Sequence, residues 1–258
     1  MKEKPFSKYQ ILANAVMIIW TLAIILPFIL LFMSSITDEN TLVANGYSFF
    51  PKKFSLASYS YIIKSGGQIL KAYGVSIGVT VVGTLLNVLL SALMAYPLSV
   101  KNLPGRNVMM FFVFFTMLFN GGIVPSYIMW TGTFHIKDTI FAQLLPNFLL
   151  SAWNVMMIRT YFTTSIPDGL YEAAEIDGAS QFTIFWKIVL PLGKPILVTM
   201  GTFAGLAYWN DWTNGLYYVT DAKLYSLQNL LNRILQDVQF LNSSTMTNAG
   251  VAATTQMP

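Results

Sequence analysis

Carboxylates are the reactive side chains that this sequence gathers most closely. Asp168, Glu172, Glu175 and Asp177 fall within ten residues and make up four of the chain's eleven acids. The partners that such acids would need for chemistry are scarce. The chain has no cysteine and one histidine, His135, which excludes thiol nucleophiles and thiolate metal sites and leaves little material for a triad or an imidazole metal cluster. We therefore predict that the chain is not an enzyme and that this acidic cluster has another purpose.

The composition is that of a membrane protein. Of the 258 residues, 55% are hydrophobic and 10% are charged, and the mean hydropathy is +0.57. A soluble domain carries about 25% charged residues. The net charge of +4 comes from Lys and Arg residues that flank apolar runs instead of forming a stripe. This placement favours anionic lipid headgroups over nucleic acid as the binding partner of the basic residues.

Long windows without charge predict five membrane-spanning helices, because about 20 apolar helical residues cross the hydrocarbon core. The first is too long for a cleaved signal and is expected to be a retained anchor helix. Later windows contain Pro97, the "NGGIVP" stretch and Pro146, breaks that a protein-lined cavity accepts and lipid does not. We expect a helical bundle with a path through it. The five windows are 9–37, 72–100, 107–134, 139–158 and 195–210.

The orientation of the bundle follows from the basic residues. With the N-terminus in the cytoplasm, the inner segments (1–8, 101–106 and 159–194) hold eight Lys and Arg, and the outer segments hold seven over about twice the length. Short basic loops carry most of the orienting effect. We predict a cytoplasmic N-terminus, which places the acidic cluster in the cytoplasm as well.

A short helix is predicted to carry the acidic cluster. Ser165 can cap it, Pro167 suits its first turn, and Asp168 lies where the helix dipole favours an anion. The helix would run through "GLYEAAEI" and end at Gly178, which can adopt a left-handed conformation.

A second helix, "QFTIFWKIVL", is expected to follow, capped by Ser180 and stopped by Pro191. Phe185 and Trp186 on this helix have two interpretations. They would wedge the element against the ends of the membrane spans, or serve as ordinary interfacial anchors.

The surface of the first helix also has two interpretations. Ala173 and Ala174 leave a shallow face between Glu172 and Glu175, which suits docking of another protein. Asp177 opposes the helix dipole unless it caps the next helix or meets a cation from a partner. The alternative is a solvated acidic loop with helix-favouring alanines, and composition alone does not separate the two.

The spacing of these residues resembles a known element. Glu172-Ala173-Ala174, then Gly178, Ile188 and Leu190-Pro191 at fixed offsets, is similar to the EAA loop of ABC importer permeases, the cytoplasmic coupling element that docks on the ATPase subunit. The flanking sequences "IPDGLYEAAEIDGAS" and "LPLGKPIL", with "PGR" and "YWNDW", resemble the carbohydrate-importer branch, the relatives of the smaller maltose-type permease. "NGGIVPSYI" is similar to the subgroup of oligosaccharide and uronide permeases of Gram-positive bacteria.

This resemblance implies a type I permease fold in the bacterial cell membrane, in which the EAA loop passes motion from the ATPase. The coupling residues would be Glu172, Ala173, Ala174, Asp177, Gly178, Ala179, Ile188 and Pro191. The expected partners are a second, different permease subunit, an ATPase dimer, an extracellular solute-binding protein, a sugar substrate and membrane lipid. The chain lacks a phosphate loop, so it is expected to bind no cofactor, with ATP and Mg²⁺ held by the ATPase.

The family pattern also sets expectations for the domains. Residues 1–34 would form the N-terminal segment and first span, 35–71 an extracellular loop, 72–212 the permease core with the EAA loop at 163–191, and 213–258 an extracellular segment. Leucines from Leu224 to Leu231, followed by Ile234, predict an amphipathic helix in the last part. Family members have six spans, so a sixth is expected after Pro258.

The translocation path is less clearly marked. Small faces at Gly74-xxx-Gly78 and Gly201-xxx-Gly205 suit close helix packing. Sugar recognition uses aromatic faces together with neutral amides, so the candidates for the path are Asn120, Asn147, Asn154, Trp209 and Asn210. Structural or interfacial roles remain open for each of them.

Three functions compete at this point. The first is the permease subunit of a carbohydrate ABC importer, and the second is the same module for peptides or amino acids. The third is a secondary carrier or a membrane scaffold. The absence of acids and bases from the five windows weighs against a proton- or sodium-driven carrier.

Overall fold

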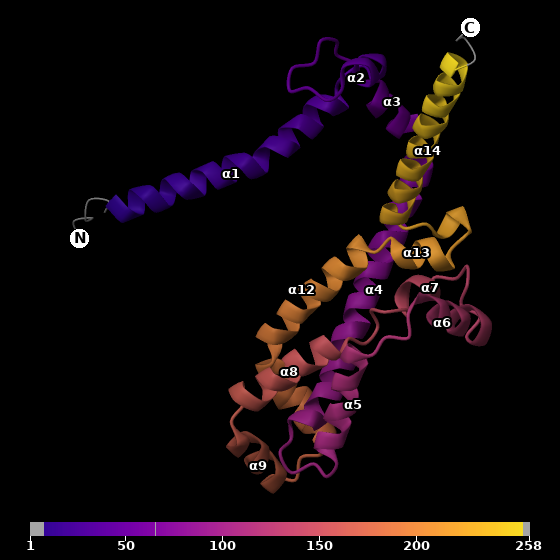
Figure 1. Ribbon diagram of the computed structural model, residues 1–258. Coiled ribbons are helices and arrows are strands. Elements are labelled where there is room, and N and C mark those ends of the chain that lie inside the picture. Colours follow the sequence, from indigo (N-terminus) through magenta and orange to yellow (C-terminus); the bar gives the residue numbers. More distant parts are fainter. Residues whose placement is uncertain (1–7, 65, 255–258) are drawn as a thin grey trace. The chain divides into compact units, whose positions relative to one another are not determined.

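The computed structural model describes residues 8–64 and 66–254 and is built mainly of helices (Figure 1). Within these residues the only extended pairing is an isolated bridge between Thr37 and Phe54. The expected all-helical class is confirmed. The chain divides into two compact units, Met1–Ile69 and Leu70–Pro258.

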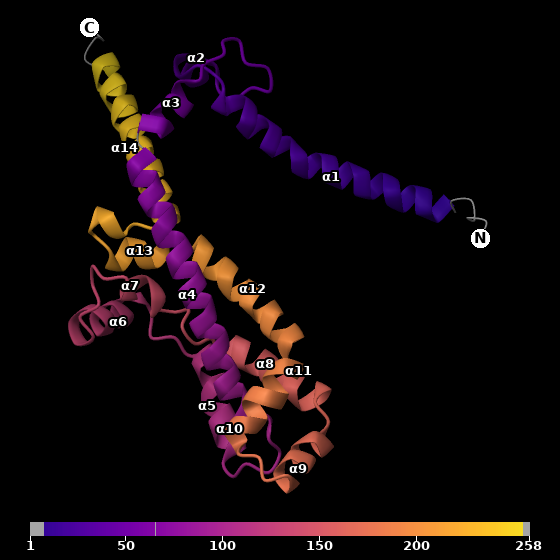
Figure 2. The same cartoon turned by 180° about the vertical axis from the view of Figure 1, so that it is seen from behind.

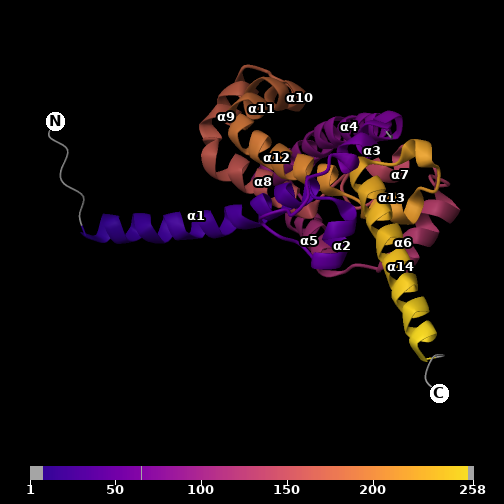
Figure 3. The ribbon, with the colours of Figure 1, turned by 90° about the horizontal axis from the view of Figure 1, so that it is seen from above.

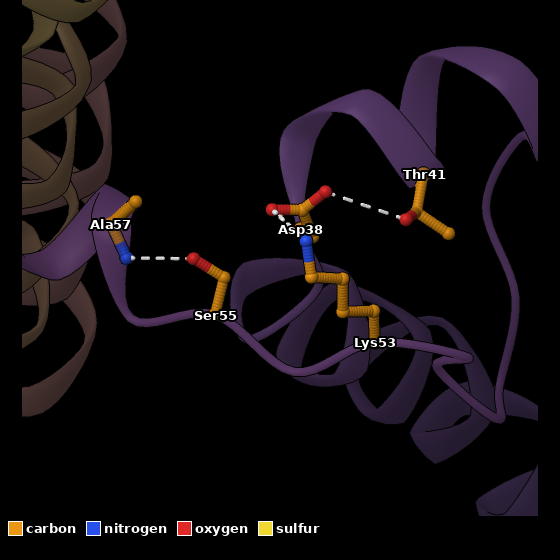
Figure 4. Close-up of polar contacts among 5 residues, drawn as sticks. All are labelled: Asp38, Thr41, Lys53, Ser55 and Ala57. Carbon is orange, nitrogen blue, oxygen red and sulfur yellow. Dashed lines mark hydrogen bonds and ion pairs between the residues drawn. The ribbon is translucent and has the colours of Figure 1, made fainter.

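The first unit is an apolar helix followed by a small hydrogen-bonded loop. Helix α1 (Lys8–Ser35) has 28 residues, none of them buried, and its apolar character on every side suits lipid. Helices α2 (Glu39–Asn45) and α3 (Ala57–Lys64) follow. Asp38 accepts a hydrogen bond from the Thr41 hydroxyl and lies 3.8 Å from the Lys53 amine (Figure 4).

Four helices form the framework of the second unit: α4 (Gly66–Ser99, in this unit from Leu70), α5 (Arg106–Leu118), α8 (Ala152–Ser165) and α12 (Lys194–Asn210). Figure 3 shows α12 between α4 and α8. Gly201 and Gly205 of α12 face Thr84 and Val88 of α4, as expected for small faces that let helices approach. The other small face, at Gly74 and Gly78, is open, since a side-chain carbon added at either glycine would meet no atom within 4 Å.

The five predicted spans are not confirmed as five helices. In the described residues two helices, α1 and α4, are long and apolar enough to cross a membrane alone. The window 107–134 is bent by 110° between α5 and the next helices, where Gly122 adopts a φ of +85°. The window 139–158 contains only the short α7 (Phe141–Leu144) and the start of α8, because Pro146 and the left-handed Asn147 interrupt it. The break expected at Pro97 is wrong, since α4 continues to Ser99.

Short helices gather where α12 ends, far from the acidic cluster. They are α6 (Ile123–Ile128), a π-helix (Met129–Thr133), α7, α13 (Thr213–Tyr218) and a 3-10 turn (Ala222–Leu224). Asp138 joins two of the connecting loops by accepting hydrogen bonds from Thr220 and Asp221, and these bonds lower the pKa of Asp138 to about 2.

The amphipathic helix predicted near the end of the chain is present as α14 (Leu227–Thr254). Leu227 and Leu230 are buried, whereas Leu231 and Ile234 are exposed. Leu224 belongs to the 3-10 turn before the helix. The Leu227 amide donates to the Ser76 hydroxyl of α4, so α14 begins against the framework.

Candidate functional site

The acidic cluster lies on a helix at one end of the second unit. Figure 2 shows helix α9 (Asp168–Ile176) at the lower end of the second unit, near α10. Pro167 occupies its N-cap position and Asp168 its first turn, as the dipole argument predicts. The predicted cap at Ser165 is wrong, because Ser165 is the last residue of α8. Pro167 favours an extended conformation at Ile166, which ends α8 and turns the chain into α9.

Helix α9 ends in a Schellman motif around Gly178. The Gly178 amide donates to the Glu175 carbonyl at 3.0 Å, and the Ala179 amide donates to the Ala174 carbonyl at 2.9 Å. Gly178 has a φ of +75°, which a residue with a side chain adopts at a cost. Ala174 and Ala179 both pack in the core, the apolar contact that accompanies this motif. The predicted turn at Gly178 is therefore confirmed.

The second helix of the element is present but irregular. Ser180 caps α10 (Gln181–Ile184) by accepting a hydrogen bond from the Thr183 amide, as expected. A π-helix (Phe185–Val189) and α11 (Leu190–Leu192) continue it. The predicted stop at Pro191 is wrong by two residues, because the chain turns at Gly193, where the axis bends by 78° into α12. Pro191 cannot donate to the carbonyl of Lys187, and directly before it the Leu190 amide closes a π-turn on the Phe185 carbonyl.

The element packs tightly on the end of helix α4. Phe185 is 2% exposed, and its ring centroid lies 5.4 Å from that of Tyr96. The Tyr96 hydroxyl hydrogen-bonds the Gln181 side chain at 2.5 Å. Tyr171 of α9 also stacks on Tyr96, with ring centroids 6.5 Å apart, and burial raises the pKa of Tyr171, so its hydroxyl stays neutral. Of the two aromatic residues considered as a wedge, Phe185 is the buried one, whereas Trp186 is 51% exposed.

The four acids of the cluster differ in their partners. Asp168 pairs with Lys101 in the loop after α4, and Glu175 accepts a hydrogen bond from Gln181 at 3.1 Å. Glu172 and Asp177 are exposed and make no side-chain contact with a polar group in the described part of the chain. Asp177 does not cap the next helix, because Ser180 does. These two carboxylates are therefore free to meet groups from another molecule.

The remaining coupling candidates divide into a buried and an exposed set. Ala174 is buried in the core and Ala173 is exposed, so the alanines do not share one face. Ala179 and Ile188 pack partly buried against the same core. Pro191 is exposed.

Sequence reasoning missed two apolar side chains of this element. Ile176 is 86% exposed at the end of α9, between two acids, and Phe182 is 71% exposed on α10. Ile176 and Phe182 therefore leave two apolar side chains uncovered on one short element. The signal in the sequence was an apolar residue that interrupts an acidic run.

The candidates for the translocation path lie in three places. Asn120 and Asn147 line one cavity at the end of the unit that holds α6 and α13. Asn154 is buried and donates to Asn87 at 2.7 Å, while Asn87 donates to the Phe148 carbonyl. Trp209 and Asn210 lie at the end of α12, where Trp209 is near Tyr73 and Asn210 donates to its own helix at Leu206. The structure brings together two of the five.

The family model for the binding-protein-dependent transport system inner membrane component matches residues 73–255 of the chain. The chain belongs to this family. It is therefore a membrane-embedded transport permease of a system that includes a binding protein, and its family is not one of enzymes.

Several known permeases are similar to this one. The polygalacturonan/rhamnogalacturonan transport system permease protein YtcP of Bacillus subtilis is 36% identical, over 88% of this chain and 78% of YtcP. Protein LplC of Bacillus subtilis is 37% identical, over 87% of this chain and 76% of LplC. A chain in the crystal structure of a bacterial ABC transporter involved in the import of the acidic polysaccharide alginate matches with a TM-score of 0.79 and 26% identity, over 95% of this chain and 89% of that chain.

The match to the alginate importer confirms the predicted type I permease fold. A buried Phe185 and a Schellman turn make the helix pair around Gly178 a rigid part of the framework.

Proposed function

We propose that this chain is the membrane permease subunit of an ATP-driven ABC importer for an oligosaccharide, and that it couples to the ATPase through residues 163–191. The single observation that carries the coupling proposal is a pair of exposed carboxylates, Glu172 and Asp177, on either side of the exposed Ile176 and without a polar partner among residues 8–64 and 66–254. The carbohydrate assignment rests on the similarity to the polygalacturonan/rhamnogalacturonan permease and to the alginate importer.

In this proposal the chain supplies half of the translocation path and a second, different permease supplies the other half. The N-terminus is cytoplasmic, and the coupling element faces the ATPase dimer, which holds ATP and Mg²⁺. ATP-driven closure of the dimer moves the two docked elements and shifts the pore towards its outward-open state. A solute-binding protein then delivers the sugar from the extracellular side.

The chemistry of the contact follows from the exposed groups. Glu172 and Asp177 meet basic side chains that line a groove on the ATPase, and Ile176 fills an apolar part of that groove. Charge pairs of this kind set orientation and association rate, and a buried apolar anchor adds affinity.

Reversing one charge tests this contact. Glu172→Arg places a cation against the proposed basic groove, so we expect at least tenfold lower recovery of the ATPase when the chain is co-expressed with its ATPase and permease neighbours and purified. Glu39→Arg, a reversal of an exposed glutamate in the first unit, is the matched control and should leave recovery unchanged. Equal recovery with Glu172→Arg and wild type would argue against docking at this helix.

A further inference from the structure

The cavity that holds Asn120 and Asn147 has the character of a ligand site. It has a volume of about 370 Å³, within the range of small-molecule pockets, which is about 300–1,000 Å³. Amide, hydroxyl and tyrosine side chains dominate its wall. The lining residues that matter below are Asn120, Ser126, Asn147, Asn214, Tyr217 and Tyr218.

The position of this cavity fits the entrance of a transport path. Helix α12 begins directly after the coupling element and ends at Asn210, three residues before α13, which forms one wall. Seventeen helical residues are about 25 Å long, close to the thickness of a bilayer core. Figures 1 and 2 both show α6, α7 and α13 together, away from α9. The cavity and the coupling element therefore lie at opposite ends of α12.

A hydrogen-bond network holds Asn147 and Asn214, two of the residues that line the cavity, in place. Asn214, 1% exposed, donates to the Pro146 carbonyl at 3.1 Å and accepts from the Asn147 amide at 3.3 Å. Asp211 accepts from the Thr213 hydroxyl at 2.7 Å and from the backbone amides of Thr213 and Asn214. Groups held in this way are preorganised for binding.

Several polar groups on the wall remain unused by the protein. The side-chain oxygen of Asn120 accepts a hydrogen bond from the Gly122 backbone amide, and the side-chain NH₂ group of Asn120 has no partner in the described residues. The Asn147 carbonyl oxygen and the hydroxyls of Tyr217 and Tyr218 likewise make no hydrogen bond there. Tyr218 stacks on Tyr127 at 5.9 Å, and Tyr217 is 42% exposed, so it can offer a ring face.

The charges at the cavity favour a neutral ligand. None of the residues that line it carries a formal charge at neutral pH. The charged side chain that hydrogen-bonds the wall directly is that of the acid Asp211, which repels anions. A site for uronate units would need Arg or Lys donors for the carboxylates.

We propose that this cavity is a binding subsite for neutral sugar units at the extracellular mouth of the permease. Hydroxyls of the sugar hydrogen-bond Asn120, Asn147 and Tyr217, and a C–H face of the ring lies against the Tyr217 ring. The subsite rests on the proposed oligosaccharide import and adds the chemical class of the substrate, in contrast to the acidic polymers in the names of two relatives.

Direct binding to the purified importer, without its binding protein, tests the subsite. Saturation-transfer NMR would be recorded with neutral xylo- and arabino-oligosaccharides and with digalacturonate. We expect a saturation-transfer signal for a neutral oligosaccharide. Tyr217→Phe and Asn120→Asp should each reduce this signal about threefold or more, because each removes a hydrogen-bond donor group. Tyr47→Phe removes an exposed hydroxyl of the first unit and should have no effect.

The other outcomes separate this inference from the function it rests on. Wild-type proteoliposomes with binding protein and ATP could take up neutral sugar while Tyr217→Phe and Asn120→Asp leave the saturation-transfer signal unchanged. This result would overturn the subsite alone. A stronger saturation-transfer signal for digalacturonate than for the neutral sugars would overturn the proposed preference of the subsite for neutral sugars. Variants that weaken docking of the binding protein without changing sugar transfer would make the cavity a protein contact instead. Absence of any sugar uptake by wild type would refute the proposed function itself.

Discussion

At the scale of single residues, the proposed coupling element is defined by the φ of Gly178 and by two carboxylates, Glu172 and Asp177, that have no polar partner in the described residues. Gly178 holds a φ of +75°, and the Schellman bonds around it fix where Ile176 and Asp177 point. The glycine turn and the Ser180 cap could be predicted from sequence, because each depends on local chemistry, whereas the two interpretations of Phe185 are separated only by its burial in the structure. The exposure of Ile176 could not be predicted, because it depends on which face of α9 packs against α4, and that face is the one that carries Tyr171.

Replacing Gly178 tests whether that angle matters for transport. A side-chain carbon there meets no atom within 4 Å, so the cost of Gly178→Val is backbone strain, about 1–2 kcal/mol. We expect the turn to relax and sugar uptake per ATP hydrolysed to fall severalfold in proteoliposomes. Gly169→Ala, in the same element with an ordinary φ and open space around it, should retain normal uptake. Normal uptake by Gly178→Val would show that the bend is dispensable.

At the scale of helices, close approach of α4 and α12 sets the framework. Gly83 lies against the Tyr208 ring, and the Tyr208 hydroxyl donates to the Leu144 carbonyl at 2.9 Å. The sequence indicated the Gly201 and Gly205 face but not Gly83, which has no partner glycine at a four-residue spacing. It also predicted a membrane span in each of the windows 107–134 and 139–158, with breaks at the "NGGIVP" stretch and at Pro146, but not the 110° bend, because hydropathy records the absence of charge and not the path of the backbone.

Substitution of the two kinds of glycine in α4 distinguishes packed from open positions. A side-chain carbon at Gly83 would lie 2.5 Å from the Tyr208 ring, so Gly83→Ala should destabilise the protein by about 1–3 kcal/mol through overpacking. Gly78→Ala meets no atom within 4 Å and should be neutral. Thermal unfolding of the detergent-solubilised variants measures both. Equal melting temperatures would contradict the close contact of α4 with α12.

At the scale of the whole molecule, helix α12 of the second unit separates the two regions to which we assign functions. One end carries exposed carboxylates and an isoleucine on a rigid helical element, and the other carries a neutral polar cavity. Membrane location and the family could be predicted from composition and the EAA spacing. The cavity could not, since residues 120–126, 147 and 213–218 are far apart in sequence and the bends between α5, α6 and α8 bring them together.

The central claim is that α9 faces the cytoplasm and seats the ATPase. The chain has no cysteine, so Ala173→Cys, on the exposed face of α9, provides a unique thiol. We predict that a membrane-impermeant maleimide labels it in inside-out vesicles, that it stays unlabelled in intact cells, and that bound ATPase protects it. Labelling from outside intact cells, or labelling unaffected by saturating ATPase, would contradict the account.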